Sequence, residues 1–439
     1  MEHPTIAGEK SAVSKARAAG EKSAFSKARL SRLRARLVER GLDGFISLAV
    51  ANQRWLTGWR QVFDDEPAHL VLVTAQDCLV HTDSRYVESM RARAAGTSWQ
   101  VDATRVSHAE FLFNYLEGLS VQGAARFKMG YEPTITLSAY RGLSRTLAKS
   151  TARLSNTRSL MATLRAVKDK EELDLLRKAQ RITDRAFMRL LEWIKPGISE
   201  LEVANKLRFN LGELGAEEVA FPPIVASGPN SALPHARPGQ RRLRQGDFVV
   251  VDFGARSQDY CADMTRTLVI GQPTSQQKDV YAAVLEAHNQ AKAALRSGLA
   301  GAKAHDIALQ CLAQRGHAEH FSHSLGHGVG IEVHESPSLA PNSKDVLEPG
   351  NVVTVEPGVY LAGSGGVRIE DCGVICAYSF PDDQPVTPLS TENTDQSATV
   401  ARDTPVAKAQ GRRSQPARAA TPPSSYDSFA TSPRELIII

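Results

Sequence analysis

The chain is poor in cysteine and contains no long apolar run. Five cysteines are spread over 439 residues without a CxxC pair: Cys78, Cys261, Cys311, Cys372 and Cys376. This spacing argues against a small disulfide-stapled framework and predicts a reducing, cytoplasmic location. No apolar stretch approaches the 18 residues of a membrane-spanning helix, and residues 1–4 contain no apolar signal region. We therefore expect neither a membrane partner nor a secretory leader.

Net charge is concentrated at the ends of the chain. The 53 Lys and Arg residues exceed the 48 Asp and Glu residues by five. Residues 1–40 hold ten basic and four acidic side chains, and residues 391–439 hold six and five, so residues 41–390 are slightly acidic. A basic folded region would be the electrostatic footprint of nucleic-acid binding. Because the excess lies at the ends, we expect no nucleic-acid partner.

Both ends differ in composition from the rest of the chain. Residues 8–17 (GEKSAVSKAR) and 20–29 (GEKSAFSKAR) duplicate a basic segment. We expect residues 1–29 to form a disordered basic tail, with a partner-binding or targeting arm as the alternative. Residues 391–439 are rich in Ser, Thr, Pro, Ala and Gln, a composition that buries too little apolar surface to offset chain entropy. They are expected to form a disordered tail.

Two folded regions are expected between these ends. Residues 30–155 begin with a helical stripe and continue with short apolar runs, which predicts a small α/β domain. The stripe consists of Leu30, Leu33, Leu37 and Val38, and the strands are expected at 45–48, 70–73 and 78–80. Residues 160–390 combine long amphipathic helices with paired apolar strands, which predicts an α+β domain. The expected fold class of the whole chain is α+β.

Two acidic side chains lie in apolar strands that are expected to pair. Asp252 follows the run VVV, and Asp263 lies in the next strand, CADMT. With a turn at Ser257 and Gln258, the two aspartates would be direct cross-strand partners with Cβ atoms about 5 Å apart. Like charges at this distance repel, and burial makes ionising both more costly. We therefore expect a positive charge between them.

The same pattern recurs later in the chain. Glu356 follows VVTV, Glu370 follows VRI, and a glycine-rich turn joins the two strands. The segment HSLGHGVGIEVHE (323–335) adds three histidines, and its glycines predict an extended backbone that approaches other groups closely. Buried carboxylates with imidazoles suit hard-to-borderline divalent ions, and the absence of a thiolate disfavours structural zinc. A pair of ions sharing carboxylates would hold a hydroxide and polarise a carbonyl.

With these motifs the chain resembles the pita-bread metallopeptidases, which include proline dipeptidase, aminopeptidase P and methionine aminopeptidase. The matching segments are SGPNSALPH (227–235), VVDFGA (250–255), YCADMTRT (260–267), HSLGHGVGIEVHE (323–335), VEPGVY (355–360) and GVRIED (366–371). LTGW (56–59) and HTDSRYVES (81–89) resemble the creatinase-like N-terminal domain of the Xaa-Pro branch. The resemblance therefore implies a pita-bread catalytic domain over 160–390, preceded by a creatinase-like α/β domain over 30–155.

The resemblance implies that five residues bind two divalent metal ions. Asp263 and Glu370 would bridge the ions, Asp252 would bind one of them, and His327 and Glu356 would bind the other. The oxygen-rich ligands favour manganese, with cobalt or zinc as alternatives. All five positions are filled, whereas creatine-hydrolysing relatives lack the full set. The family also implies a homodimer.

The resemblance assigns further residues to catalysis. His235, His323 and His334 match the substrate and transition-state histidines of the family, and Arg368 matches an arginine beside the last ligand in the proline-specific branch. His334 would stabilise the developing oxyanion, and His235 and His323 would position the proline side of the substrate. Glu356 would transfer the proton while also serving as a ligand.

The expected activity is hydrolysis of the bond between an N-terminal residue and proline, as in an Xaa-Pro aminopeptidase. Its partners would be peptides with proline at the second position. Proline dipeptidase is the alternative, and the two differ in whether the pocket admits chain beyond proline. Hydrolysis of a small amide or amidine, and a non-catalytic peptide- or histone-binding protein, are weaker alternatives. The last of these predicts degraded ligand positions, which the sequence does not have.

Overall fold

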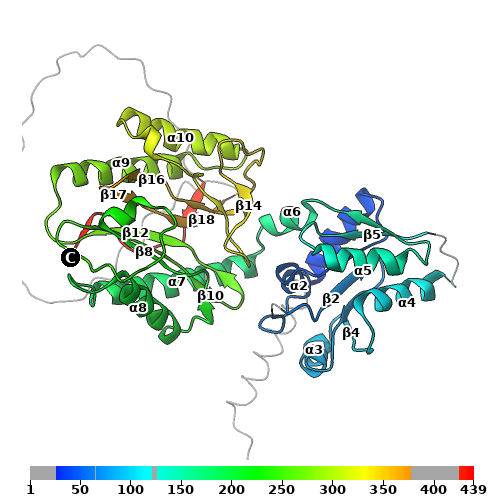
Figure 1. Cartoon of the computed structure of the whole chain (residues 1–439). Helices are drawn as coiled ribbons and strands as arrows, with labels where there is room; N and C mark the ends of the chain where they lie inside the picture. The colour runs from blue at the N-terminus through cyan, green and yellow to red at the C-terminus, as the bar shows by residue number, and fades with distance from the viewer. Residues whose placement is uncertain (1–25, 65, 121–125, 377–424) are drawn as a thin grey trace, which may run out of the picture.

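The computed structural model describes residues 26–64, 66–120, 126–376 and 425–439, and Figure 1 shows them as two lobes joined by one connection. The N-terminal lobe is built on a single mixed sheet, and the second lobe places paired sheets between two layers of helices. This arrangement confirms the predicted α+β class. Among the described residues, no helix combines the length and apolar character that a membrane span requires.

The N-terminal lobe contains a six-stranded sheet in the order β4-β3-β2-β1-β5-β6. Its strands are β1 (Gly44–Ser47), β2 (Leu70–Thr74), β3 (Cys78–His81), β4 (Gln100–Asp102), β5 (Lys128–Tyr131) and β6 (Arg153–Asn156). The helices are α2 (Val50–Thr57), α3 (Val87–Ala94), α4 (His108–Ser120) and α5 (Leu137–Leu147). Alternate residues of β2 enter two different apolar cores, which is why this strand is a continuous apolar run.

A further helix over 26–39 packs on this lobe. Leu30, Leu33 and Leu37 of the predicted stripe are buried, whereas Val38 is 78% exposed, so its inclusion in the stripe is wrong. Val38 lies about 100° around the helix from Leu37, which places it on the outer face. The expected basic tail over 1–29 otherwise lies outside the described residues.

Three helices lead from the first lobe into the second: α6 (Leu160–Ala166), α7 (Lys170–Leu191) and α8 (Glu200–Glu213). Helix α7 begins at a capping box formed by Asp169 and Glu172. Helix α8 also begins at a capping box, because Ser199 accepts from the Glu202 amide while Glu202 accepts from the Ser199 amide.

In the part of the chain that the structure describes, the second lobe contains four antiparallel sheets, one of which carries β20 as a parallel edge strand. Its strands are β7 (Glu218–Val219), β8 (Ile224–Ser227), β9 (Phe248–Phe253), β10 (Ala255–Ser257), β11 (Tyr260–Cys261), β12 (Met264–Val269), β13 (His327–Gly328), β14 (Glu335–Ser338), β15 (Val352–Val355), β16 (Gly358–Leu361), β17 (Gly365–Arg368), β18 (Asp371–Ile375), β19 (Tyr426–Ser428) and β20 (Ile437–Ile438). The sheet orders are β20-β12-β9-β8, β14-β13-β15-β18-β19 and β11-β10-β7, and β16 pairs with β17. Helices α9 (Ser275–Ala294) and α10 (Gly301–Gln314) cover one side, and α7 and α8 cover the other (Figure 1). Two short 3-10 turns, η1 (Gly228–Ala232) and η2 (Ala318–His320), complete the lobe.

The register of the first hairpin differs from the prediction. The turn lies at Gln258 and Asp259, which both have positive φ, rather than at Ser257 and Gln258. Asp252 therefore pairs with Thr265 instead of Asp263. Positive φ at both central residues is the pattern of a type I′ turn, whose twist matches that of the paired strands. Because the shift is two residues, Asp252 and Asp263 still face the same side.

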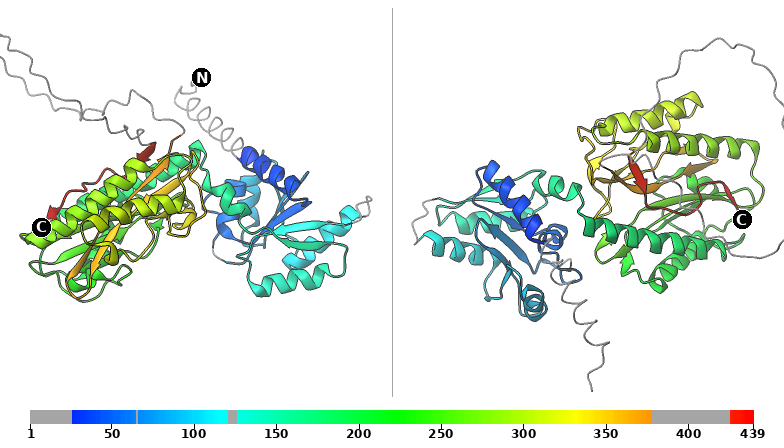
Figure 2. Two further views of the ribbon diagram at one scale, coloured as in Figure 1. Left: turned by 90° about the horizontal axis from the view of Figure 1, so that it is seen from above. Right: turned by 180° about the vertical axis from the view of Figure 1, so that it is seen from behind.

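The expected disordered tail over 391–439 is wrong for residues 425–439. Strand β19 pairs with β18, and β20 pairs with β12 in parallel. Figure 2 shows these C-terminal residues, in red, running along the second lobe. Apolar residues such as Phe429 and Ala430 are buried there, which offsets the entropy of ordering this end. The remainder of the predicted tail, residues 391–424, lies outside the described residues.

Candidate metal centre and active site

All nine residues selected from the sequence line one cavity of about 280 Å³ in the catalytic lobe. They come from separate elements that the sheet pairing brings together: Asp252 on β9, Asp263 just before β12, His327 on β13, Glu356 just after β15, Arg368 on β17, Glu370 just before β18, and His235, His323 and His334 in the intervening loops. Residues more than 100 positions apart thus meet at one point.

Asp263, His327 and Glu370 form the tightest cluster. Each offers one ligand atom, and these atoms all lie within 4.8 Å of one another. His327 Nε2 lies 3.7 Å from Asp263 Oδ2 and 3.3 Å from Glu356 Oε1. The distances place a fourth potential ligand, Glu356, at the edge of the same cluster.

The imidazole of His327 is oriented by its own backbone. Its Nδ1 lies 3.1 Å from the Gly328 carbonyl oxygen, so Nδ1 donates there and Nε2 faces the carboxylates. The predicted close approach of the glycine-rich segment is confirmed at Gly326, where an added Cβ would lie 2.2 Å from the Thr354 carbonyl oxygen. A larger residue at this position would displace the strand that carries the imidazole.

Asp252 lies beside the cluster and is held by Arg368. Arg368 Nη2 donates to Asp252 Oδ2 at 2.6 Å, and Arg368 Nε donates to Thr265 Oγ1 at 3.1 Å. Thr265 Oγ1 in turn donates to Glu370 Oε2 at 2.7 Å. The other carboxylate oxygen, Asp252 Oδ1, is buried without a hydrogen-bond partner among the described residues. A buried carboxylate oxygen without a hydrogen-bond partner is expected where that oxygen would bind a metal ion.

The electrostatics of the cavity indicate a shortage of positive charge. Burial, and next the neighbouring carboxylates, raise the pKa values of Asp263 and Glu370 well above their usual range. Burial would also raise the pKa of Glu356, but its hydrogen bond and ion pair with His327 hold it at about 2. Arg368 and one imidazole cannot neutralise four buried carboxylates. Divalent cations fit this donor set, which consists of carboxylate oxygens and one imidazole nitrogen.

Comparison with known proteins identifies the fold. Residues 29–167 match the creatinase/prolidase N-terminal domain, and residues 174–377 match metallopeptidase family M24. Over 347 residues the chain is 36% identical to the uncharacterized peptidase YqhT of Bacillus subtilis, an alignment that covers 79% of this chain and 94% of that protein. The chain belongs to metallopeptidase family M24. It is therefore a metallo-exopeptidase of the pita-bread fold, which overturns the alternative of a non-catalytic binding protein.

Other M24 proteins with named activities are also similar to this chain. The chain is 43% identical over 212 residues to an Xaa-Pro dipeptidase of Pyrococcus furiosus, covering 48% of this chain and 61% of that protein. An Xaa-Pro dipeptidase structure from Bacillus anthracis superposes with a TM-score of 0.77 at 32% identity, covering 94% of this chain and all of that one. An X-Pro aminopeptidase from Thermotoga maritima gives a TM-score of 0.74 at 28% identity, covering 93% and 99%. The family implies divalent metal ions and Xaa-Pro peptides as substrates.

Two residues at the centre of this M24 site, Thr265 and Tyr360, were not predicted from the sequence. The Tyr360 hydroxyl lies 2.8 Å from His323 Nε2 and accepts from Arg368 Nη1 at 2.9 Å. His323 Nδ1 faces the Ser324 carbonyl oxygen at 2.8 Å, so the arrangement is consistent with Tyr360 donating to Nε2. The motif VEPGVY, which contains Glu356, ends in this tyrosine, and its place in that motif was the available signal.

The remaining two histidines lie at the rim of the cluster. The rings of His334 and His327 are 4.2 Å apart between centroids. Burial lowers the pKa of His334, as it lowers that of His323, so both are neutral at physiological pH. His235 lines the cavity beside Pro234, whose carbonyl oxygen accepts from Arg368 Nη1 at 3.0 Å. A neutral imidazole can donate one hydrogen bond to a substrate oxygen.

Proposed function

We propose that this chain is a dinuclear Xaa-Pro aminopeptidase, which hydrolyses the bond between an N-terminal residue and proline. The observation that carries the proposal is the convergence of four carboxylates, four histidines and Arg368 on one cavity. The bond that precedes proline has no N–H, which makes it a poor substrate for general peptidases. The similarity to an X-Pro aminopeptidase of Thermotoga maritima supports this substrate class.

In this proposal five residues hold two divalent ions. Asp263 and Glu370 would be shared by both ions, Asp252 would hold one of them, and His327 and Glu356 would hold the other. The orphaned Asp252 Oδ1 and the cluster of Asp263, His327 and Glu370 support the assignment. Such ions supply hydroxide near neutral pH and polarise the carbonyl when they are bound. We propose manganese as the ion, since carboxylate ligands favour it.

The remaining residues act on the substrate. His334 donates a hydrogen bond to the oxygen on which negative charge develops, a kind of contribution worth about 2.7–4 kcal/mol in a well-studied enzyme. Glu356 takes and returns the proton. His235 and His323 position the proline side, and Arg368 keeps Asp252 and Tyr360 in place through the bonds described above.

The test is hydrolysis of an Xaa-Pro-Yaa tripeptide by the purified full-length chain with manganese. We expect release of the first residue, loss of activity with a chelator, and no cleavage of the matched Xaa-Ala-Yaa peptide. Glu370→Gln should abolish activity while leaving the circular dichroism spectrum unchanged. Binding of stoichiometric metal without release of the first residue from any proline peptide would refute the proposal.

Proline dipeptidase is the second candidate. The Xaa-Pro dipeptidases of Pyrococcus furiosus and Bacillus anthracis are similar to the chain and favour it. Parallel assays on Xaa-Pro and on Xaa-Pro-Yaa-Zaa separate the two activities, because a dipeptidase cleaves only the first.

We propose that the protein is a homodimer, because the family implies it. Light scattering at several concentrations measures the oligomeric state. We also propose a reducing compartment. Cys78, Cys261, Cys311 and Cys372 are buried and form no disulfide among the described residues, which supports this proposal.

A further inference from the structure

We propose that a second chamber beside the metal cavity binds the residues of a peptide that follow proline, and that Arg54 and Arg256 bind a carboxylate there. The inference rests on the proposed function and specifies its substrate class. The chamber has a volume of about 620 Å³, compared with about 280 Å³ for the metal cavity. His334 lines both spaces, so the chamber continues the active site.

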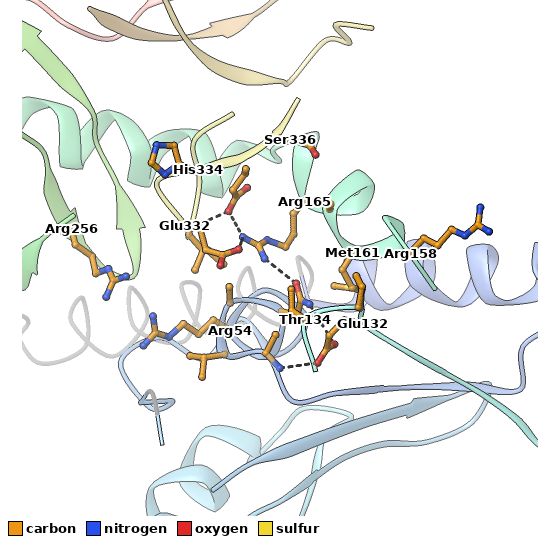
Figure 3. Close-up of a pocket in the computed structure, with 18 residues that line it drawn as sticks. Arg54, Glu132, Thr134, Arg158, Met161, Arg165, Arg256, Glu332, His334 and Ser336 are labelled. Atoms are coloured by element: carbon orange, nitrogen blue, oxygen red, sulfur yellow. Dashed lines mark hydrogen bonds and ion pairs between the residues drawn. The ribbon is translucent and has the colours of Figure 1, made fainter. Parts of the chain in front are cut away.

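The chamber lies between the two lobes. The N-terminal lobe contributes Arg54 on α2, the connection contributes Arg165 on α6, and the catalytic lobe contributes Arg256 on β10. The segment 331–336, which carries His334, forms part of the wall (Figure 3). A peptide that extends past His334 therefore passes between the lobes.

The two buried glutamates of the chamber, Glu132 and Glu335, already form hydrogen bonds or ion pairs. Glu132 accepts from the Leu48 and Ala49 amides at 2.5 and 2.8 Å. Glu335 forms ion pairs with Arg165 and with Lys168, the latter at 3.2 Å. Because these partners satisfy the two buried carboxylates, neither is a free acceptor for a peptide cation.

Arg54 and Arg256 retain capacity to bind an anion. Arg54 Nη2 donates to the Phe63 carbonyl oxygen at 2.6 Å, and its Nε lies 3.3 Å from Asp259 Oδ1. Arg256 Nη1 lies 3.2 Å from Glu218, whose side chain is 67% exposed, so water screens this pair. A guanidinium carries five N–H donors, more than these contacts use. Figure 3 places the two guanidinium groups on the same side of the chamber.

The charge of the chamber suits the last residue of a peptide. The chamber is lined by four arginines and three glutamates. A peptide offers a carboxylate at its last residue. Each extended residue spans about 3.3–3.6 Å, so the carboxylate of Xaa-Pro remains in the metal cavity, while an added residue moves it toward the chamber.

The experiment compares an Xaa-Pro-Yaa tripeptide with its C-terminal amide on the full-length manganese-loaded protein. We expect the free acid to have a kcat/KM about tenfold higher, equivalent to about 1.4 kcal/mol. Arg54→Gln and Arg256→Gln should each reduce this preference, chiefly through KM, and should leave the hydrolysis of Xaa-Pro unchanged. Arg158→Gln is the matched control, since Arg158 lines the same chamber but points away from the other two arginines (Figure 3).

The outcomes separate the two proposals. Failure to cleave any proline peptide overturns the proposed function. Cleavage with equal kcat/KM for acid and amide in the wild-type protein overturns the inference alone. A preference for the acid that survives both Arg54→Gln and Arg256→Gln also overturns it. Should a variant fail to fold, as judged by circular dichroism, the wild-type comparison of acid and amide still decides.

Discussion

Tyr360 connects an arginine and a histidine that the sequence places 45 residues apart. Its hydroxyl lies within hydrogen-bond distance of both His323 Nε2 and Arg368 Nη1. Burial raises the pKa of this tyrosine, so the hydroxyl keeps its proton and its donor role. The orientation of the histidine on the proposed proline side therefore depends on one oxygen atom.

Replacing Tyr360 with Phe should lower kcat/KM for Xaa-Pro-Yaa about tenfold. The reason is that a charged donor and a buried imidazole lose their shared partner, a loss of about 1.5–3 kcal/mol for hydrogen bonds to charged groups. Steady-state kinetics measures the effect, and calorimetric titration should find unchanged metal binding. Tyr281→Phe is the control, because the Tyr281 hydroxyl donates to the Arg434 carbonyl oxygen outside the cavity. Equal activity of the two variants would contradict the prediction.

A second residue-scale prediction concerns His288. Burial lowers its pKa to about 3, although Asp371 lies 3.5 Å away. The unfolded chain takes up a proton near pH 6.5 that the folded chain excludes until about pH 3, so stability falls as pH drops through this window. The loss is at most about 1.4 kcal/mol per pH unit. Urea midpoints from pH 7 to pH 4.5 should fall less steeply in His288→Gln than in the wild type, and parallel curves would count against this account.

At the scale of elements, the C-terminal segment 425–439 contacts residues adjacent to the proposed metal ligands. Arg434 Nε donates to Asp371 Oδ2 at 2.6 Å. Arg266 Nη2 donates to Asp371 Oδ1 at 3.0 Å, and its Nη1 donates to the carbonyl oxygen of the proposed ligand Glu370 at 2.6 Å. The last residues of the chain thus belong to the same charged network as the cavity.

Exchanging residues 377–424 for a short Asn-Gly turn should preserve fold and activity. Ile375 and Tyr426 are direct partners across β18 and β19, so a hairpin can close there. Shortening the connection between β18 and β19 from about 48 residues to a few lowers the entropic free-energy cost of closing it by roughly 2 kcal/mol. The melting temperature should therefore rise. Truncation before residue 425 should instead lower it and reduce metal binding, because Asp371 loses Arg434. Calorimetry distinguishes the two variants, and a tolerated truncation would refute the supporting role.

At the scale of the whole molecule, metal should stabilise the fold. The carboxylate cluster exists only in the folded chain, so an ion that binds it shifts the unfolding equilibrium by mass action. Manganese at 100 times its dissociation constant should add about 2.7 kcal/mol. Differential scanning calorimetry with and without chelator measures this shift. Asp263→Asn should respond much less, and an identical response would argue that the ions bind elsewhere.

Much of this organisation could be predicted from the sequence. The α+β class followed from amphipathic helices and paired apolar strands. The four carboxylates of the cavity followed from their places in apolar strands, since such groups rarely occur there without partners, whereas His235 and Arg368 were selected through the resemblance to the family. The register of the first hairpin could not be predicted, because it depends on which residues adopt positive φ. Strands β19 and β20 were missed because they are short and follow a long segment of low apolar content. Thr265 and Tyr360 were not predicted, because the role of a hydroxyl depends on hydrogen-bond partners that lie on other strands.

The chamber between the lobes lay beyond sequence reasoning, because it depends on how the lobes are placed. One arginine in the chamber wall, Arg165, contacts residues of both lobes. Arg165 Nη1 donates to Asn52 Oδ1 of the N-terminal lobe at 2.9 Å, and its Nη2 binds Glu335 beside His334. A tilt of the first lobe would therefore shift, through one guanidinium, the segment that carries His334. Asn52→Ala should accordingly lower kcat in steady-state kinetics, although Asn52 does not line the metal cavity.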